Sequence, residues 1–178
     1  MLRDGLTFDI QQFSCKDELV SRLPKRLKGY ASWLPDARRL FVLVDRDDDD
    51  CRLLKARLEK IAMDAGLKTW TKHGHARFQV CNRIVVEELE SWFFGDWQAV
   101  RAAYPRVDAT LPSRAGFRNP DAIAGGTWEA LERELKKRGY HAAGLPKITF
   151  AREVAAHMVP ARNKSASFKM LRDTLAIL

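Results

Sequence analysis

The pattern of apolar and polar residues along the first half of the chain predicts strands that alternate with helices. Residues 6–13 alternate in polarity, as in a half-buried strand, and residues 40–44 are five consecutive apolar residues. Such a run is typical of a strand that is buried on both faces. A further strand is predicted within residues 77–86. We expect residues 40–44 to form the central strand of a sheet, with strands on both sides.

Helical spacing of apolar residues fills the segments between these strands. Residues 14–28 predict a helix with Ser14 as its N-cap, and Pro24 predicts a break or kink inside it. Apolar residues within 54–65 recur on one helical face, and Gly66 is expected to end that helix. A strand, a turn and a helix in this order form half of a βαβ unit.

From residue 87 onward the chain is mostly helical in pattern. A helix is predicted from Glu87 to Gly95, and further helices are predicted at 97–104, 127–138, 146–158 and 165–178, with a loop rich in Pro, Gly and Arg at 105–126. We therefore predict a single α/β domain over residues 1–178. Its core, residues 1–96, would hold a mostly parallel central sheet flanked by helices, with a helical part, 97–178, packed on it.

Length and composition restrict the class of protein. A chain of 178 residues has room for one domain with a full core, and no apolar run reaches the roughly 18 residues that a membrane span needs. Residues 1–10 do not resemble a secretory signal. Three widely spaced cysteines, without a CxxC pair, argue against both a disulfide framework and a zinc site. These features indicate a cytoplasmic protein.

Charge indicates a polyanionic partner. The formal net charge is +8, so nucleic acid is the first partner to consider. Against this basic background stands one dense acidic run, Asp45-Arg46-Asp47-Asp48-Asp49-Asp50. Basic residues that attract a phosphate backbone, around carboxylates that hold cations, are what a metal-dependent phosphodiesterase requires.

Asp45 and Asp47 are the first candidate pair. Residues two apart on an extended backbone point the same way, so both carboxylates would lie at the carboxyl end of a buried strand. Ligands bind at that edge of open α/β sheets, and Mg²⁺ prefers hard oxygen ligands. The alternative is that Asp47 to Asp50 only cap the next helix and oppose its dipole.

Glu87, Glu88 and Glu90 form the second candidate group. If a helix begins at Glu87, then Glu87 and Glu90 share one face at the end of another strand. In a parallel sheet this places the glutamates near Asp45. We expect their carboxylates within about 8 Å of the Asp45 and Asp47 pair, roughly the span that two bridged metal ions can cover. The alternative is that these acids only stabilise the first turn of the helix.

Two basic regions are candidates for phosphate contacts. His73, with His75, could bind metal, and a basic loop near nucleic acid is the alternative. A second polar group stands near the start of the last predicted helix, where free N–H groups favour anions. Here too a solvated loop with Ser165 as N-cap is the alternative. Its members are Lys147, Arg162, Asn163, Lys164 and Ser165.

Several blocks of the sequence resemble one bacterial family. They are Arg39-Leu-Phe-Val-Leu-Val-Asp-Arg-Asp, Asn82-Arg-Ile-Val-Val-Glu-Glu-Leu-Glu-Ser-Trp-Phe-Phe-Gly-Asp, Ala103-Tyr-Pro-Arg, Asn119-Pro-Asp-Ala-Ile-Ala-Gly-Gly-Thr-Trp-Glu, Gly144-Leu-Pro-Lys and Arg162-Asn-Lys-Ser-Ala-Ser-Phe. Together they are similar to the family called domain of unknown function 4276. That family is similar to the Toprim-like domains of topoisomerases, primases and overcoming-lysogeny-defect nucleases.

The resemblance implies a Toprim-like fold, Mg²⁺ or Mn²⁺ as cofactor and an ATPase partner in an anti-phage defence setting. Toprim chemistry uses a glutamate on a first strand and a DxD on a later strand, which corresponds to Asp45 and Asp47. Relatives carry the glutamate strand ahead of the stretch that opens here at Leu6, and Met1 to Gly5 contain no such strand. Glu87 or its neighbours are the candidates to replace that glutamate.

Two functions are therefore expected. The first is a Mg²⁺-dependent nuclease that cuts DNA or RNA as a defence effector, with Asp45, Asp47, Glu87 and Glu88 as catalytic residues. Its metal ligands would be Asp45, Asp47, Glu87 and Glu90. The second is a Toprim-like subunit that cuts nothing and binds nucleic acid or its ATPase partner. A homo-oligomer is compatible with either function.

Overall fold

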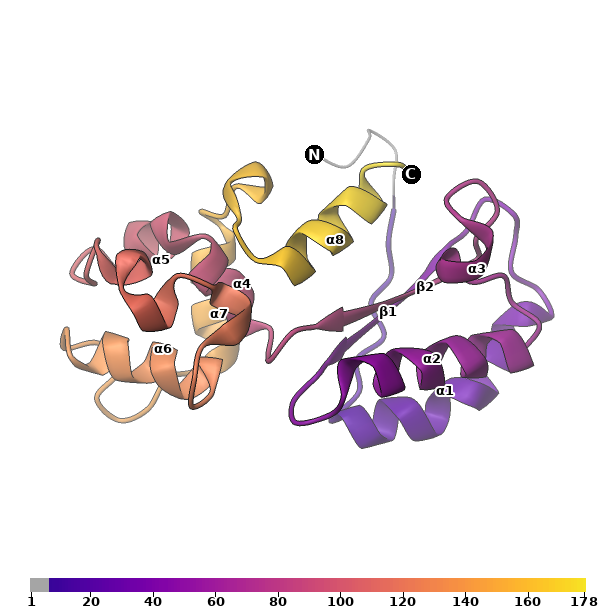
Figure 1. Ribbon diagram of the computed structural model, residues 1–178, viewed down its shortest axis with the longest axis horizontal. Coiled ribbons are helices and arrows are strands. Elements are labelled where there is room, and N and C mark those ends of the chain that lie inside the picture. The colour runs from indigo at the N-terminus through magenta and orange to yellow at the C-terminus, as the bar shows by residue number, and fades with distance from the viewer. Residues whose placement is uncertain (1–6) are drawn as a thin grey trace. The chain divides into compact units, whose positions relative to one another are not determined.

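A computed structural model describes residues 7–178 and shows a mixed α/β chain in two compact units (Figure 1). Unit 1 extends to Ile84 and includes Asp173–Leu178, and unit 2 is Val85–Arg172. The predicted boundary between an α/β part and a helical part lies after residue 96. The division between the compact units comes about twelve residues earlier, since it lies after Ile84. That the whole chain is one domain stays a prediction.

Two parallel strands form the sheet of unit 1. They are β1 (Leu40–Asp45) and β2 (Val80–Val85), so the strands predicted at 40–44 and within 77–86 are confirmed. The predicted central position of β1 is wrong for the described chain, because within residues 7–178 β1 pairs with β2 alone.

The strand predicted at residues 6–13 is not found. Leu6 lies outside the described residues, and residues 7–13 form no strand. Phe8 and Ile10 are 72% and 71% exposed, so the apolar side of this alternating segment has no core to cover it. Alternation in the sequence predicts a strand only where one of its faces becomes buried.

Three helices accompany the strands: α1 (Lys16–Ala31), α2 (Cys51–Asp64) and the short α3 (Trp70–His73). Figure 1 shows α1 and α2 side by side below the sheet. The core of unit 1 lies between these two helices and the strands. It contains Val20, Leu23 and Leu27 of α1, Leu54, Leu58 and Ala62 of α2, and Val42, Val44 and Val80 of the strands.

The ends of these helices differ in part from the sequence-based expectation. The N-cap of α1 is Cys15 instead of Ser14, and Pro24 lies inside a continuous helix. A proline removes one backbone hydrogen bond, and α1 nevertheless continues, with Leu23 and Leu27 buried on either side of it. At α2 the expectation is confirmed: Gly66 follows the helix with a φ of +83°, which favours glycine.

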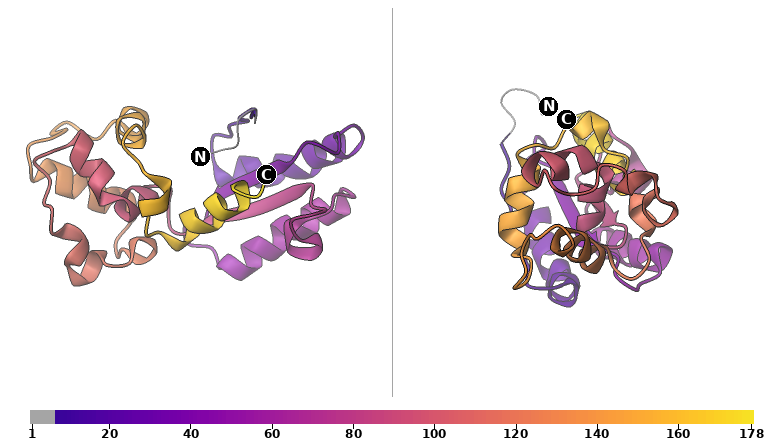
Figure 2. Two further views of the ribbon diagram at one scale, coloured as in Figure 1. Left: turned by 90° about the horizontal axis from the view of Figure 1, so that it is seen from above. Right: turned by 90° about the vertical axis from the view of Figure 1, so that its left-hand side faces the viewer.

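Helices and the loops between them build the core of unit 2. Its elements in chain order are α4 (Glu90–Gly95), α5 (Trp97–Ala103), η1 (Leu111–Ser113), η2 (Ala115–Phe117), η3 (Pro120–Ala122), α6 (Thr127–Lys136), α7 (Lys147–Ala155), η4 (Pro160–Arg162) and α8 (Ala166–Leu175), whose last residues belong to unit 1. Figure 2 shows α4 to α7 gathered as a helical group. The helices predicted after residue 97 are confirmed, and short 3-10 turns occupy the predicted loop.

Aromatic packing holds the helices of unit 2 together. Phe93 of α4 packs edge-on against Phe150 of α7, with ring centroids 5.3 Å apart. Phe94 stacks on Trp97 of α5 at 5.4 Å. Such pairs add about 0.5–1.5 kcal/mol each to the burial of their area. The segment Trp92–Trp97 is therefore the packing centre of this unit.

Within residues 7–178, no helix combines the length and the apolar composition that crossing a membrane requires.

Truncation of a core leucine on α2 tests the packing of unit 1. Leu58 is fully buried, so Leu58→Ala should lower the free energy of unfolding by about 2–5 kcal/mol through lost burial and a residual cavity. Leu53 on the same helix is 73% exposed, and Leu53→Ala should change the free energy of unfolding by less than about 0.5 kcal/mol. Urea titrations followed by circular dichroism measure both, and equal effects would contradict the described burial.

Candidate functional site

The loop between β1 and α2 carries the acidic run. Asp45 is the last residue of β1 and is half-buried, as predicted for the carboxyl end of the strand. The chain then turns, and the Asp49 N–H donates to the Arg46 carbonyl oxygen at 3.1 Å. Asp47 has a φ of +49°, so the extended backbone assumed from Asp45 to Asp47 is wrong at Asp47. Asp tolerates this left-handed conformation better than most residues do.

Lys16, in the first turn of α1, offsets part of the negative charge of this loop. Its Nζ lies 2.9 Å from Asp47 Oδ2 and 2.9 Å from Asp49 Oδ2, and it donates to the Arg46 carbonyl oxygen at 3.1 Å. Burial alone would lower the pKa of Lys16, but the hydrogen bonds to Asp49 and Asp47 raise it above its usual value. The ammonium group is therefore held in its charged form.

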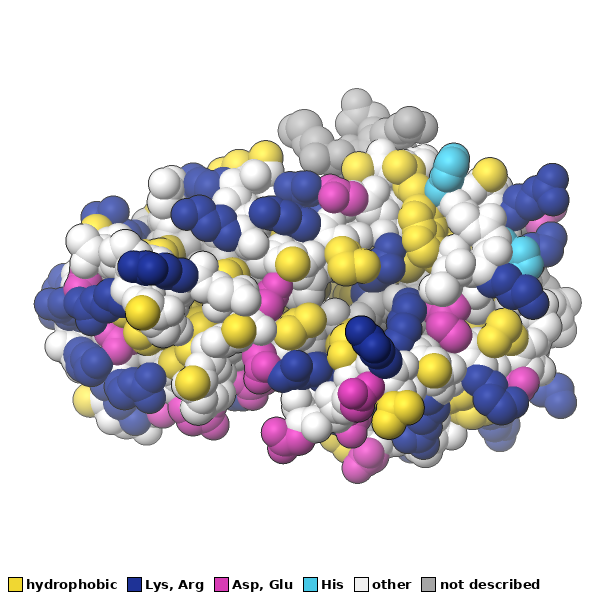
Figure 3. Space-filling model, viewed as in Figure 1, with side chains coloured by type: hydrophobic (Ala, Val, Ile, Leu, Met, Phe, Trp, Pro, Cys, Tyr) yellow, Lys and Arg dark blue, Asp and Glu magenta, His cyan; other side chains and the backbone are white. Residues whose placement is uncertain are grey.

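The last aspartate of the loop has a capping role. The Asp50 side chain accepts from the N–H groups of Arg52 and Leu53, both at 2.9 Å, and is the N-cap of α2. The capping alternative is thus confirmed for Asp50. Figure 3 shows Asp and Glu side chains together at the lower edge of the view, over this loop.

The donors around Lys16 fit a hard cation. Two carboxylate oxygens and one carbonyl oxygen already surround a positive charge, and Asp45 precedes them directly. Within residues 7–178, no three His, Cys, Asp or Glu side chains form a potential metal-binding group. Mg²⁺ differs from zinc in this respect, because it is commonly bound through one or two carboxylates and keeps several waters.

The three predicted glutamates lie in unit 2, whereas Asp45 and Asp47 lie in unit 1. The expected approach within about 8 Å therefore stays a prediction. The helix predicted from Glu87 begins at Glu90 instead, because Glu87 has a φ of +63° and cannot continue a right-handed helix. The prediction that Glu87 and Glu90 are neighbours on one helical face is consequently wrong.

Glu88 and Glu90 have distinct surroundings. Glu88 Oε2 accepts from Thr127 Oγ1 at 2.8 Å and from the Trp128 N–H at 2.9 Å, so it caps the start of α6. Glu90 is 8% exposed, and desolvation raises its pKa, with Glu88 and Glu129 adding repulsion and Lys147 opposing it. Metal binding by these side chains stays a prediction.

Arg162 forms an internal ion pair. Its Nε donates to Asp96 Oδ1 at 2.6 Å and its second nitrogen to Asp96 Oδ2 at 3.0 Å, and the Asp96 side chain is fully buried. The Val159 N–H donates to the same carboxylate at 2.9 Å. Asn163 is buried and donates to the Trp92 carbonyl oxygen at 2.8 Å. Arg162 and Asn163 thus tie the segment before α8 to α4.

An aspartate of this chain occupies the start of α8. Asp121 accepts from Ser165 Oγ at 2.6 Å and from the N–H groups of Ala166 and Ser167 at 2.6 and 3.1 Å. Ser165 Oγ also accepts from the Phe168 N–H at 3.1 Å, so the alternative reading of Ser165 as an N-cap is confirmed. The N–H groups predicted to receive a phosphate already bind this carboxylate.

The remaining predicted nucleic-acid residues are exposed. Lys147 Nζ lies 4.2 Å from the ring centroid of Trp128. Lys164 is also exposed. His73 lies on α3 in unit 1, with Nδ1 3.3 Å from the Thr69 carbonyl oxygen. His73 therefore belongs to a different unit from Lys147 and Lys164. Contact of these residues with nucleic acid stays a prediction.

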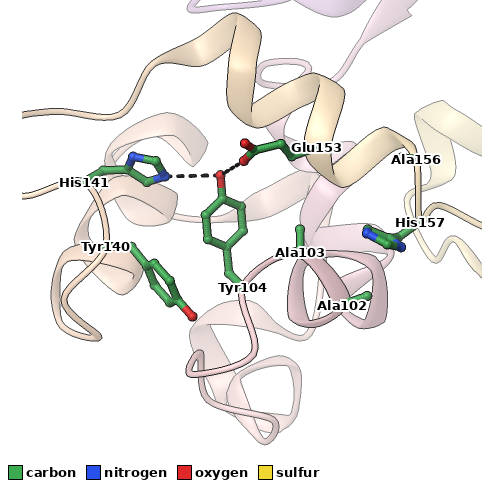
Figure 4. Close-up of a pocket in the computed structure, with 8 residues that line it drawn as sticks. All are labelled: Ala102, Ala103, Tyr104, Tyr140, His141, Glu153, Ala156 and His157. Carbon is green, nitrogen blue, oxygen red and sulfur yellow. Dashed lines mark hydrogen bonds between the residues drawn. The ribbon is translucent and has the colours of Figure 1, made fainter.

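A pocket of about 480 Å³ in unit 2 was not predicted from the sequence (Figure 4). Tyr104 Oη donates to Glu153, and His141 Nε2 lies 3.1 Å from the same hydroxyl oxygen. Burial raises the pKa of Tyr104, and the Glu153 carboxylate raises it further. These three residues are 37 and 49 positions apart, and no local sequence signal joins them. The buried hydroxyl is satisfied within the protein.

The sequence matches one family over nearly its whole length. Residues 2–176 match the family described as Domain of unknown function (DUF4276). No curated protein and no solved structure matches the chain.

Removal of the Arg162 side chain should affect stability before it affects any binding. Arg162→Ala leaves the buried Asp96 carboxylate without its cation and should cost about 3 kcal/mol of unfolding free energy. Lys164→Ala, two residues away and exposed, should cost less than about 0.5 kcal/mol. Urea titrations of the two variants measure this difference. A stable Arg162→Ala protein with weakened nucleic-acid binding would instead support a direct contact with phosphate.

Glu90 should make the stability of the protein depend on pH. A carboxyl whose pKa is raised by folding binds its proton more tightly in the folded state, so stability falls as pH rises above the unfolded-state pKa. Glu90→Gln should therefore raise Tm at pH 7.5, and this gain should shrink as the pH approaches 4. Glu129→Gln, an exposed neighbour, is the control. A lower Tm for Glu90→Gln at pH 7.5 would show that the charged carboxylate stabilises the fold.

Proposed function

We propose that this chain, which belongs to the DUF4276 family, is a Toprim-like phosphodiesterase that cuts nucleic acid with the help of Mg²⁺ or Mn²⁺. Its cation site would be the acidic loop, defined as residues 45–50. An anti-phage defence setting and an ATPase partner, which the family resemblance implies, are part of this proposal.

One observation carries the proposal. Asp47 Oδ2, Asp49 Oδ2 and the Arg46 carbonyl oxygen surround one positive charge directly after the carboxyl end of a parallel strand. Ligands of α/β sheets bind at that end. Oxygen donors that hold an ammonium group at about 3 Å can hold a divalent ion at shorter distances after small movements.

The residues of the loop would divide the work. Asp45 and Asp47, with Asp49, would hold the cation, and Asp50 keeps the loop attached to the start of α2. When bound, the cation would activate a water and neutralise charge on the phosphate. The net charge of +8 on the whole chain favours the approach of a polyanion.

Lys16 would compete with the divalent ion for the same carboxylates. Its ammonium contacts Asp47 and Asp49, so the ion must displace it or share these oxygens. A released Lys16 would lie beside the cation, where it could contact a phosphate oxygen of the substrate.

The same contact favours a second candidate function. Lys16 already offsets part of the negative charge of the loop, so the loop can be stable without a metal ion. The chain would then be a non-catalytic Toprim-like subunit that binds nucleic acid or an ATPase partner. The two candidates differ in a single measurable property, which is cleavage that depends on a divalent cation.

A cleavage assay with variants of two neighbouring aspartates tests the proposed function. Plasmid DNA and total RNA are incubated with the protein in Mg²⁺, in Mn²⁺ and in EDTA. Cleavage is expected with either cation, absent in EDTA and lost in Asp47→Asn. Asp48→Asn removes the same charge from an exposed neighbour and should keep activity. No cleavage of either polymer by wild-type protein, or equal activity in both variants, would contradict the proposed nuclease function. The non-catalytic binding subunit would then be the better account.

Replacement of Lys16 should strengthen binding of the divalent ion. Lys16→Gln removes a competing charge about 3 Å from two carboxylates, a contact worth about 1 kcal/mol in a water-like medium. The dissociation constant for Mg²⁺ should fall about five- to tenfold in isothermal titration calorimetry. Lys60→Gln, whose ammonium pairs with Asp64 on the surface of α2, is the matched control. Equal affinity in wild type and Lys16→Gln would show that the cation does not bind in this loop.

A further inference from the structure

We propose that unit 1 binds the phosphate backbone of nucleic acid through a basic cluster at the amino end of its sheet. The basic cluster is defined as Arg38, Arg39, Lys68, Lys72 and Arg77. This inference rests on the proposed function for its choice of nucleic acid as the ligand. It adds a binding site at the end of β1 opposite to the acidic loop.

The fold brings three separate segments together there. The Leu40 N–H at the start of β1 donates to the Gln79 carbonyl oxygen at 2.8 Å, and the Gln79 N–H donates to the Lys68 carbonyl oxygen at 2.7 Å. The residues before β1, Lys68 ahead of α3 and the turn that leads to β2 are therefore adjacent. These segments contribute four of the five cations, and the fifth, Lys72, lies on α3.

An edge-on pair of aromatic rings supports the cluster from inside unit 1. Trp70 of α3 packs edge-on against the buried Phe78 at 4.9 Å between ring centroids, and the guanidinium of Arg39 lies 5.4 Å from the centroid of Phe78. Lys72 and Arg77 lie between these two rings in the chain and are exposed. Figure 3 shows Lys, Arg and His side chains gathered at the right-hand end of unit 1, over α3 and the adjacent turn.

The cations of the cluster have no anionic partner in the described part of the chain. Of residues 7–178, no acidic side chain forms an ion pair with any of the five, although other lysines and arginines of unit 1 are paired. Arg39 donates only to backbone carbonyl oxygens, those of Asp36 and Arg38. Five unpaired cations in one region repel one another, and a polyanion would relieve that repulsion.

The composition of the surface favours nucleic acid over an acidic protein. Interfaces between proteins have an apolar centre and are depleted in lysine, whereas interfaces with nucleic acid are strongly positive and polar. Here four of the five cations are exposed, with Asp36 as one exposed acid nearby in the chain, and the aromatic Phe78 is only 1% exposed. Phosphate groups therefore suit this surface better than a protein partner does.

The basic cluster and the acidic loop lie far enough apart to act independently. β1 has six residues, which at about 3.3 Å per residue separates its two ends by roughly 20 Å. That distance exceeds the Debye length of about 8–10 Å at physiological salt. Removal of cations from the cluster should therefore leave cation binding by the acidic loop unchanged.

A salt titration of binding with two charge-matched double variants tests the inference. Lys72→Gln with Arg77→Gln removes two exposed cations of the cluster, and Arg22→Gln with Lys60→Gln removes two cations that are already paired, with Glu18 and Asp64. Fluorescence anisotropy with a labelled DNA duplex of about 20 base pairs measures affinity between about 50 and 200 mM salt. Thermal melts verify that both proteins are folded.

The cluster variant should lose about two phosphate contacts. The slope of log affinity against log salt should then decrease in magnitude by about two, with affinity weakened on the order of 10- to 100-fold at about 0.1 M salt. The control should change both quantities much less. Equal effects of the two variants, competition by polyglutamate as effective as that by unlabelled duplex, or wild-type binding without salt dependence would each overturn the proposal.

The outcome also separates this inference from the proposed function. Binding that depends on the cluster, in a protein that cleaves nothing with Mg²⁺ or Mn²⁺, would support the binding site and contradict the nuclease. Cation-dependent cleavage that Lys72→Gln with Arg77→Gln leaves unchanged, with unchanged duplex affinity, would support the nuclease and contradict the binding site.

Discussion

The repulsion within the acidic loop is the constraint on which the arrangement of unit 1 depends. Five aspartates stand within six residues at the carboxyl end of β1, and that density of charge requires positive partners nearby. Lys16 at the start of α1 pairs with both Asp47 and Asp49, and Asp50 caps the first turn of α2. The same contacts therefore hold the loop, α1 and α2 together at the strand end where a substrate would bind.

Carboxylates also serve as internal anchors in unit 2. Asp96 pairs with Arg162, Asp121 caps α8 and Glu88 caps α6. Asp96 and Asp121 bind a cation and N–H groups that the sequence analysis had assigned to an external phosphate, and Glu88, predicted as a catalytic residue, binds an internal N–H group. Five cations without an ion pair to a described acidic side chain lie instead in unit 1, in the basic cluster. Cation binding and phosphate attraction are thus both proposed for unit 1, which holds the sheet.

Much of the fold could be predicted from the sequence, because β1, β2, α2 and the helices after residue 97 follow local apolar periodicity. The helix predicted from Glu87 fails, because a single left-handed residue delays it by three positions. Lys16 could not be found as the partner of Asp47, since 31 positions separate the two and only tertiary packing joins them. Asp96 and Arg162, 66 positions apart, were missed for the same reason.

Binding of Mn²⁺ observed by nuclear magnetic resonance tests the central claim, that the acidic loop is a divalent-cation site. A paramagnetic ion broadens the signals of the amides closest to it. With the isotope-labelled protein, substoichiometric Mn²⁺ should selectively broaden the amide signals of Arg46 to Asp49 and of Lys16, and excess Mg²⁺ should restore them. Broadening centred on Glu87 to Glu90 instead, or uniform broadening that Mg²⁺ does not reverse, would contradict the account.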